Sequence, residues 1–597
     1  LKSYSTLSRL TLHKSQPPLS HLVSELPCLP HAAMTPPPVY GQAAAGPPGS
    51  GDAASTEDGD GSSEFDPLLK KNPLCDLGCI DWFAALLEHF GYKLLALLFV
   101  VQHLLRGFVD SLTMQSQPYI YRAFKTPAPQ MQIFQGITML PWAMKPIVGL
   151  LSDTVPIGGY NKGPYMLMAT VVGSLAFLAV GWMGHPDKGL TIGLLVAAFF
   201  CCSLQLSTCD ILTEAKYSEK IRMSPAHGPS ILTYVWFGMQ VGGLVGIILS
   251  GLVISRWEAH HTYLISVPVA LSVAAPVLLG YVEEEKQTEQ ETAAKRAKFA
   301  EQKEAVFLCI LIFVLIICLT VTLMFTHDVF MNAAMAVASG IIMVIAFAVT
   351  LSPVIARANT FAVLQSSLSW STAGAGFYFF TDTPEQYPEG PHFSEFFYTS
   401  VIGTVGACLS LAGIATYQRY LSKWKYRELM IMTNLVTACF SLCDVLIYTR
   451  LNLKMGIPDH AFVLSSTVLG SVVSQWMWMP QVVIMAYLCP KGMEATMYAL
   501  LAGCHNLGNT IGSSCGALML ELLGCRPDGS PGESKQFENL WIAGVVATLL
   551  PTITTVLTVN LLPDARQDEK LLSDEASMDA TSGSLWQRWS KVDEAED

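Results

Sequence analysis

Residues 141–165 read PWAMKPIVGLLSDTVPIGGYNKGPY, and this stretch is the most informative in the chain. It predicts an apolar helix that carries Lys145 and ends near Asp153. A loop rich in glycine and proline follows, and a second apolar helix begins at Tyr165. A charged side chain within an apolar, membrane-length helix is costly and usually marks a functional site. The stretch therefore predicts a transport pathway or its gate.

The composition predicts an all-α polytopic membrane protein. Hydrophobic residues make up 51% of the chain and charged residues only 14%, with a mean hydropathy of +0.41. Apolar runs of about 20 residues, the length that crosses a bilayer, recur along the chain. The net charge of −12 comes largely from the two tails, and the absence of a basic domain argues against nucleic acid as a partner. The expected surroundings are therefore a lipid bilayer.

The apolar runs predict fourteen membrane spans in a 6+2+6 arrangement. The predicted spans are 93–116, 131–152, 165–184, 190–212, 229–255, 262–282, 305–326, 329–355, 358–380, 395–418, 428–449, 460–488, 494–523 and 539–562. The predicted organisation is a disordered cytoplasmic tail (1–90), a six-helix bundle (91–282), a charged cytoplasmic linker (283–304), two additional transmembrane helices (305–355), a second six-helix bundle (356–562) and an acidic cytoplasmic tail (563–597).

Loop charges predict the orientation. Lysine and arginine gather in 283–304 and 419–427, whereas 381–394 has neither. Because basic loops stay in the cytoplasm, both termini are expected there, and the plasma membrane is the expected location. At the N-terminus, the change of composition at Met34 predicts that translation starts there, with a transit peptide as the alternative.

An internal repeat supports two related bundles. A turn from glycine to basic residues follows the second helix of each, at 149–162 and 413–425, and a glutamate follows each fourth helix, at Glu214 and Glu494. Such two-fold similarity is typical of secondary transporters, whose binding site lies between the halves. A gate at the cytoplasmic side is predicted from residues of these turns, namely Gly149, Asp153, Lys162, Arg419 and Lys423.

The first span carries polar residues that are candidates for substrate contact. His103, Arg106 and Asp110 lie at i, i+3 and i+7, which predicts one shared helical face. Arg106 and His103 are predicted to bind substrate, and Asp110 to carry a coupling proton. The alternative is an ion pair between Arg106 and Asp110 that only cancels charge. Trp236 is a candidate to stack on a planar substrate ring, although such aromatics more often serve packing.

The charged residues of the second and fourth spans also allow two interpretations each. Lys145 either faces the cavity as a partner for anionic substrate or extends its side chain to the cytoplasmic interface. Asp210 and Glu214 are candidates for proton coupling, because burial can bring a carboxyl pKa toward neutrality. The alternative is a pair of interfacial caps bound to Lys216 or Lys220.

Missing motifs narrow the function. The chain has no phosphate-binding loop of an ATP-driven pump, no nucleophile elbow, no dinucleotide motif and no His/Cys ligand cluster in its sequence. We therefore expect that the protein is not an enzyme and holds no cofactor or metal. The expected source of energy is an ion gradient.

Two stretches resemble the folate–biopterin transporter family of the major facilitator superfamily. One is K-P-x-x-G-x-x-S-D-x-x-P-x-x-G-Y at residues 145–160. The other is C-P-K-G-M-E-A-T at 489–496, followed by Ala499, Asn506-Leu507-Gly508 and Gly512. A weaker match covers 210–214, and the extra helix pair and long tails look most like the protozoan members. The chain departs from the family after Tyr160, where 161–163 (Asn-Lys-Gly) replace a cluster of arginines.

The resemblance implies a major facilitator fold and proton-driven import of folate or biopterin, with Lys145, Asp153 and Asp210 as important charges. The expected function is therefore secondary transport of a pteridine together with protons, by alternating access. A transporter of the same fold for S-adenosylmethionine or another small metabolite is the first alternative. A nutrient sensor that binds without transporting is the second.

Overall fold

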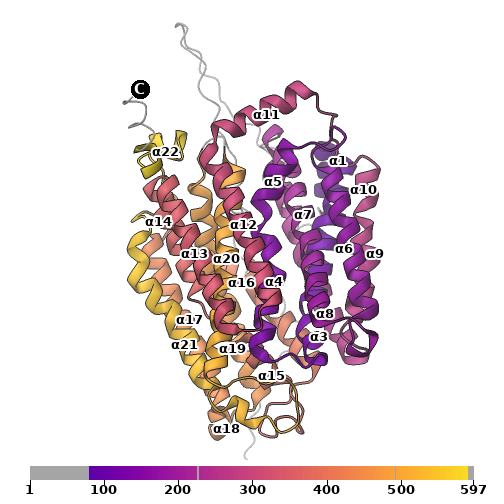
Figure 1. The fold of residues 1–597 in the computed structure, drawn as a ribbon, viewed down its shortest axis with the longest axis vertical. Helices are drawn as coiled ribbons and strands as arrows, with labels where there is room; N and C mark the ends of the chain where they lie inside the picture. The colour runs from indigo at the N-terminus through magenta and orange to yellow at the C-terminus, as the bar shows by residue number, and fades with distance from the viewer. Residues whose placement is uncertain (1–78, 225–226, 491–492, 589–597) are drawn as a thin grey trace, which may run out of the picture. The chain divides into compact units, whose positions relative to one another are not determined.

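The computed structural model describes residues 79–224, 227–490 and 493–588. These residues form helices joined by loops and no sheet (Figure 1). Eleven helical segments are long and apolar enough to cross a membrane. The other three predicted spans coincide with α20 and with two broken helices, α4–α5 and α14–α15. The predictions for residues 1–78, including the start at Met34, lie outside the described residues.

The first bundle contains eleven helical segments that make up six spans. They are α1 (Cys79–Leu98), η3 (Phe99–Val109), α2 (Asp110–Met114), α3 (Gln117–Ala123), α4 (Ala128–Ala143), α5 (Lys145–Thr154), α6 (Gly163–Met183), α7 (Ile192–Met223), α8 (Gly228–Arg256), α9 (His261–Ser272) and α10 (Ala274–Leu278). A short helical turn, η4 (Pro186–Lys188), lies in the loop before α7.

The linker, the additional pair and the second bundle follow in chain order. They are α11 (Glu289–Glu301), α12 (Lys303–Phe325), α13 (Val329–Thr350), α14 (Pro353–Ser367), α15 (Ala373–Thr381), η6 (Phe397–Val401), α16 (Ile402–Thr416), η7 (Tyr417–Leu421), α17 (Tyr426–Tyr448), α18 (Leu451–Lys454), α19 (Asp459–Tyr487), α20 (Glu494–Leu522), η8 (Ser534–Phe537), α21 (Leu540–Thr558), η9 (Val559–Leu561) and α22 (Asp574–Met578).

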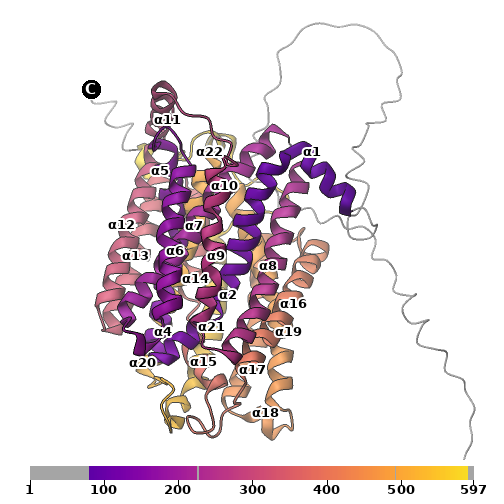
Figure 2. The same ribbon diagram turned by 90° about the vertical axis from the view of Figure 1, so that its right-hand side faces the viewer.

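Two helices differ from the sequence prediction in ways that matter for the site. The first begins at Cys79, within the segment assigned to the tail, and kinks at Gly91, whose φ is 75° (Figure 2). The fourth span continues to Met223, beyond the predicted end at residue 212. At about 1.5 Å per residue, this extension places Asp210 roughly 20 Å from the end of α7 and not at the membrane interface.

The additional helix α12 shows the pattern of a membrane span at the edge of the molecule. One face is buried, with Leu308, Ile312 and Ile316 among its members. The opposite face is exposed and equally apolar, with Phe307, Ile310, Val314, Ile317 and Val321 at helical spacing. A helix that is apolar on both its buried and its exposed face fits surroundings of lipid and not water.

The two bundles meet along two lines of helix contact. The most extensive contact joins α4 with α20, and a second joins α8 with η6. The additional pair covers the first of these lines, because α12 packs on α4 and α13 on α20. Glycine permits close approach within the first bundle, where Gly242 and Gly246 of α8 lie directly against backbone carbonyls of η3.

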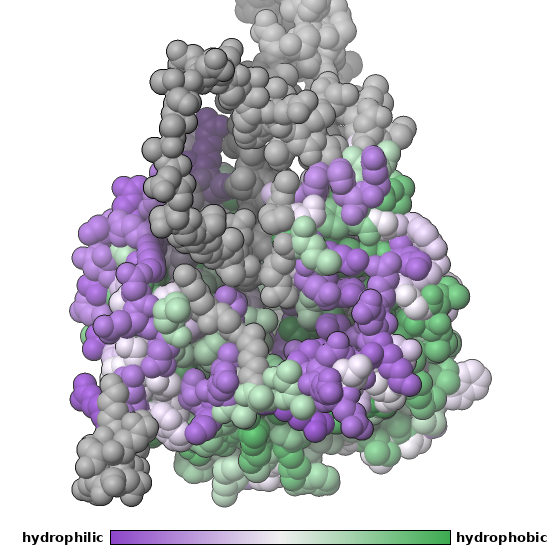
Figure 3. Space-filling view, turned by 90° about the horizontal axis from the view of Figure 1, so that it is seen from above, coloured by the Kyte–Doolittle hydropathy of each residue, from purple (hydrophilic) through white to green (hydrophobic). Residues whose placement is uncertain are grey.

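The loops gather at two ends of the bundles. We call the end with the α11 linker and the α22 segment the linker end; it includes 155–162, 279–302, 422–425 and 562–588. The opposite loop end includes 124–127, 184–191, 257–260, 382–396 and 523–539. Figure 3, a view of the linker end, shows hydrophilic residues across this face and apolar ones at its edges.

Candidate functional site

Charged residues from three spans of the first bundle meet in one cluster. The Nζ atom of Lys145 lies 2.6 Å from Oδ2 of Asp210 and 3.7 Å from Oε2 of Glu214. Arg106 forms an ion pair with Asp110 one helical turn further along the same span. We call these five residues the charged cluster. The structure thus brings together five of the residues that the sequence singled out.

The structure shows the partners of Lys145 and of the two acids of α7. The ammonium group of Lys145 lies inside the bundle, where Asp210 of α7 binds it. Asp210 and Glu214 pair with this lysine and not with Lys216 or Lys220, which bind Glu219 and Glu283 instead. Pairing inside the bundle reduces the high cost of charge at membrane depth.

Trp142 is the central member of the site that the sequence analysis missed. The Arg106 guanidinium lies 4.2 Å from the centre of the Trp142 ring, and the Lys145 ammonium lies 5.0 Å from it. A cation within about 6 Å of an aromatic face is attracted to it. The tryptophan therefore holds both cations beside one flat surface. Its position three residues before Lys145 is a signal that sequence reasoning could have used.

The second span is broken at this point. The α4 helix ends at Ala143, Met144 is the junction, and α5 begins at Lys145. Pro141 and Pro146 flank the break and remove backbone donors from the helix. A half-helix that begins inside the bundle places the positive end of its dipole there.

The charged cluster has more acids than bases. Two cations, Arg106 and Lys145, face three carboxyl groups, so one carboxyl has no cation of its own. Glu214 is that group, because it is the more distant partner of a lysine that Asp210 already binds. Its side chain is also the most exposed of the cluster's acids, at 34%. Glu214 is therefore the acid of the charged cluster with the most distant cationic partner.

Two predicted substrate residues lie apart from the charged cluster. Nε2 of His103 is 2.9 Å from the carbonyl oxygen of Tyr234, and the ring packs on Tyr234 and Phe99 at the contact with α8. The segment η3 is π-helical, so residues three apart do not share a face as they do in an α-helix. Trp236 is half exposed on α8.

The predicted gate residues lie at the linker end, where the structure joins none of them by an ion pair to another described residue. Arg419 and Lys423 are exposed, and a side chain added at Gly149 would meet open space. The α11 linker covers this region, because Nε of Arg296 donates to the Thr154 carbonyl at 2.8 Å. Glu284 accepts hydrogen bonds from the backbone of Lys162 and Gly163.

The bundles are joined by hydrogen bonds at the loop end. The side chain of Gln132 donates to the Ser371 carbonyl at 3.1 Å and accepts from the Gly374 amide at 2.9 Å. Arg122 donates to the Thr381 carbonyl at 3.3 Å and pairs with Glu395 at 3.4 Å. These contacts link the start of α4 and the end of α3 to the opposite bundle. They close the loop end.

We expect replacement of Arg122 by alanine to lower the free energy of unfolding by about 1–3 kcal/mol, the usual cost of leaving partly buried acceptors unpaired. The measurement is thermal unfolding of the purified protein in detergent. Lys454→Ala is the matched control, because Lys454 is exposed at the same end. An unchanged midpoint for Arg122→Ala would show that the closure does not depend on this residue.

Asp382, at the end of α15, is a titratable group of the loop end. It is fully buried, and burial together with the neighbouring Glu533 carboxyl raises the pKa of Asp382 to about 9. The native protein therefore holds a proton that the unfolded chain releases near pH 4. Stability should fall as the pH rises from about 4 to about 9, since the native state binds more protons there.

The variant Asp382→Asn removes this titration while keeping the shape of the side chain. We expect the variant's stability relative to the parent to increase by up to about 4 kcal/mol from pH 5 to pH 8, because each pH unit between the two pKa values costs the parent about 1.4 kcal/mol. Thermal unfolding from pH 5 to pH 9 tests this expectation. If parent and variant showed the same slope against pH, Asp382 would not hold the proton.

The second bundle presents a different set of polar groups. His505 of α20 is half-buried, and the centre of its ring lies 5.1 Å from that of the Trp478 ring. Asp444 of α17 interacts electrostatically with Tyr398 of η6 and with Tyr448 at the end of its own helix. Neither group has a cationic partner among the described residues, so the cations of the site belong to the first bundle.

Comparison with known proteins gives the following relatives. The model of the BT1 family matches residues 106–581. A probable folate-biopterin transporter 6 of Arabidopsis thaliana is 24% identical over 81% of this chain and 86% of its own. A folate-biopterin transporter of Synechocystis is 25% identical over 72% and 73%. Folate transporter 1 of Plasmodium falciparum is 21% identical over 72% of each chain.

Solved structures with a similar fold are also transporters. A peptide transporter, POT, in complex with sulfate gives a TM-score of 0.54 at 12% identity and covers 79% of this chain and 96% of its own. The nucleoside transporter NupG gives 0.50 at 10% identity and covers 78% and 99%. At such identity the likeness concerns the fold alone, and it confirms the predicted all-helical major facilitator fold.

Proposed function

Since the chain belongs to the BT1 family, whose model matches residues 106–581, we propose that it is a secondary transporter that imports folate or biopterin together with protons. The family match confirms the resemblance that residues 145–160 predicted. The relatives that are named folate or folate-biopterin transporters support the substrate class. A multi-pass membrane protein with polar residues in its interior suits this task.

The observation that carries the proposal is that one lysine is shared between two carboxyl groups inside the bundle. Lys145 binds Asp210 and approaches Glu214. An anionic substrate would have to compete with these carboxyls for the same ammonium group. Protonation of Glu214, and then of Asp210, weakens their hold on Lys145 and leaves the cation free for the substrate. Competition for one cation thus couples the two ligands.

The planar part of a pteridine suits the other side of the charged cluster. Trp142 offers an aromatic face, and Arg106 lies over it as a planar donor. Guanidinium groups recognise carboxylates and ring oxygens through paired hydrogen bonds. We assign Arg106 and Lys145 to the substrate, Glu214 and Asp210 to the proton, and Asp110 to holding Arg106 in place.

We further propose that the linker end faces the cytoplasm, as the basic loops require, and that the protein lies in the plasma membrane. The structure then corresponds to a state that is closed toward the outside by contacts such as Arg122–Glu395. In the opposite state, Gly149, Asp153 and Lys162 would meet Arg419 and Lys423 across the linker end. Alternating access consists of exchange between these two states.

Uptake of radiolabelled folate and biopterin in a host without its own uptake tests the proposal. We expect saturable uptake that rises when the outside is more acidic and falls when a protonophore is added. Competition by unlabelled S-adenosylmethionine tests the first alternative substrate. Binding of folate without any uptake would favour a sensor and contradict transport.

A further inference from the structure

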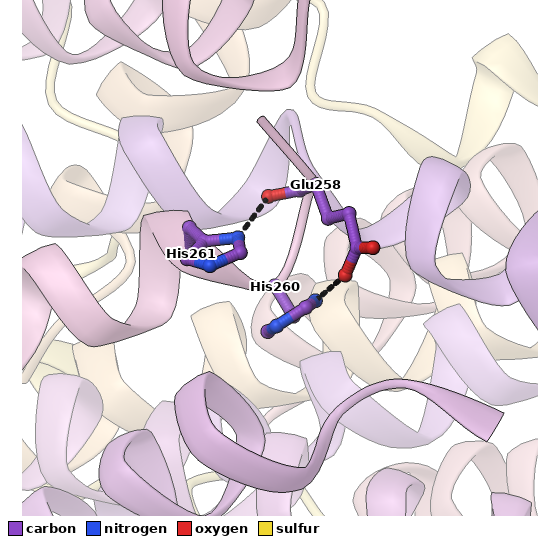
Figure 4. Close-up of side chains that lie close together, drawn as sticks. All are labelled: Glu258, His260 and His261. Carbon is purple, nitrogen blue, oxygen red and sulfur yellow. Dashed lines mark hydrogen bonds and ion pairs between the residues drawn. The ribbon is translucent and has the colours of Figure 1, made fainter. Parts of the chain in front are cut away.

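The turn between α8 and α9 carries three side chains of the kinds that ligate metals. Glu258, His260 and His261 each offer one ligand atom, and these atoms lie within 4.8 Å of one another (Figure 4). The turn belongs to the loop end. Measured along α8, it lies far from the charged cluster. None of the three residues has a part in the proposed transport chemistry.

The local fold brings these groups together. The α8 helix ends at Arg256 and α9 begins at His261, and the His261 amide donates to the Glu258 carbonyl at 3.0 Å. This turn places Oε2 of Glu258 3.2 Å from Nδ1 of His260. Nδ1 of His261 lies 3.1 Å from the Glu258 carbonyl oxygen. All three groups therefore face one another across a single turn.

The ligand set selects the class of metal. Two imidazoles and one carboxylate suit Zn²⁺, whereas Ca²⁺ and Mg²⁺ prefer sites built from oxygen. Donors of one zinc ion lie about 3.3–3.5 Å apart, given Zn–N bonds of about 2.0–2.1 Å. The side chains would need to close by about 1 Å. This is possible because the Glu258 side chain is 56% exposed, while the buried His260 provides a fixed ligand.

Lys188 is the group that now occupies part of this space. Its Nζ atom lies 3.3 Å from Nε2 of His260, the nitrogen that faces away from Glu258. A metal ion on Nδ1 leaves the ring proton on Nε2, which cannot accept a hydrogen bond from Lys188. The exposed lysine must then turn away, and its positive charge opposes the ion in any case. Removing this charge should strengthen metal binding.

The surroundings of the turn connect it to the closed loop end. Glu258 and His260 line a cavity of about 350 Å³, and Arg122 and Glu395 line the same cavity. The ion pair between the bundles therefore lies in the wall of the space that the turn faces. From these observations we propose that Glu258, His260 and His261 bind Zn²⁺ at the loop end, with a fourth position left open to water.

Calorimetric titration of the purified full-length protein with ZnCl₂ tests the proposal, after chelator treatment and with accessible thiols blocked. We expect one saturable site in the parent protein that excess Ca²⁺ does not displace. Affinity should fall at least about tenfold in His261→Ala and in Glu258→Gln, because each removes a ligand. In Lys188→Met, which keeps the length of the side chain without its charge, affinity should rise.

His327→Ala is the matched control, because His327 is exposed in the loop between α12 and α13 at the same end. It should bind Zn²⁺ as the parent does. The altered ligand residues lie in a surface turn, and unchanged thermal unfolding without metal would show that the variants fold. Parental Zn²⁺ affinity in both ligand variants would overturn the proposal. The titration needs no pteridine, so its outcome is independent of the proposed transport.

Discussion

Replacement of Lys145 by alanine is expected to reduce folate and biopterin uptake at least about 100-fold. The variant removes the cation that we assign to the substrate and leaves Asp210 and Glu214 without a partner inside the bundle. Truncating one partner of a buried, hydrogen-bonded charge pair between a protein and its ligand costs about 2–5 kcal/mol or more, and about 3 kcal/mol corresponds to a factor of about 100. Initial uptake rates, normalised to the amount of protein in the membrane, provide the measurement.

A loss of uptake could also arise from misfolding, and a second variant separates the two causes. In Lys145→Ala with Asp210→Asn, the carboxylate that lay closest to the lost ammonium group is also gone, so part of the stability should return while uptake stays low. Lys145→Arg keeps the charge and should retain part of the activity. Lys454→Ala, at an exposed site, should behave as the parent. Near-parental uptake by Lys145→Ala would remove this residue from the substrate site.

The fold was largely predictable because membrane spans are encoded locally. Each of the fourteen predicted spans coincides with a helix or with a broken helix, since runs of about 20 apolar residues have few other solutions in a bilayer. The residues at which the helices end were less predictable. The fourth helix continues to Met223 through a stretch after residue 212 that is rich in polar residues. Such an extension cannot be predicted from hydropathy alone.

The sequence was enough to predict which residues form the site, but not which of them pair with one another. Lys145, Asp210 and Glu214 stand out because charge is rare in apolar helices, yet only the packing of α5 against α7 joins them. His103 lies away from Arg106 because η3 is π-helical, and a helix-face argument assumes 3.6 residues per turn. The contact of Arg122 with Glu395 joins residues far apart in the chain, which no local pattern indicates.

The excess of carboxyls over cations in the charged cluster explains why coupling should depend on one residue more than on the others. Asp110 and Asp210 each have a close cation of their own. Glu214 must share Lys145 and is the most exposed of the three. A carboxyl with a distant, shared cation loses least when it is protonated. Under the proposed mechanism, Glu214 is therefore the residue that we expect to carry the coupling proton.

The variant Glu214→Gln is accordingly expected to bind and exchange substrate but to lose accumulation driven by a proton gradient. A difference of one pH unit stores about 1.4 kcal/mol per proton, enough for about tenfold accumulation. In vesicles that contain the purified protein, the parent should approach this value and Glu214→Gln should stay at the external concentration. Exchange of internal unlabelled for external labelled folate should continue, because it requires no net proton movement.

Two further variants decide whether the effect belongs to Glu214. Glu219→Gln lies on the same helix, where Glu219 is more exposed and pairs with Lys216, and it should accumulate folate as the parent does. Asp210→Asn frees Lys145 from its closest partner and should impair exchange as well as accumulation, since the position of that cation changes. Undiminished accumulation by Glu214→Gln would assign the proton to another carboxyl. Asp210 would then be the remaining carboxyl that contacts Lys145, and competition for that cation would still couple the proton to the substrate.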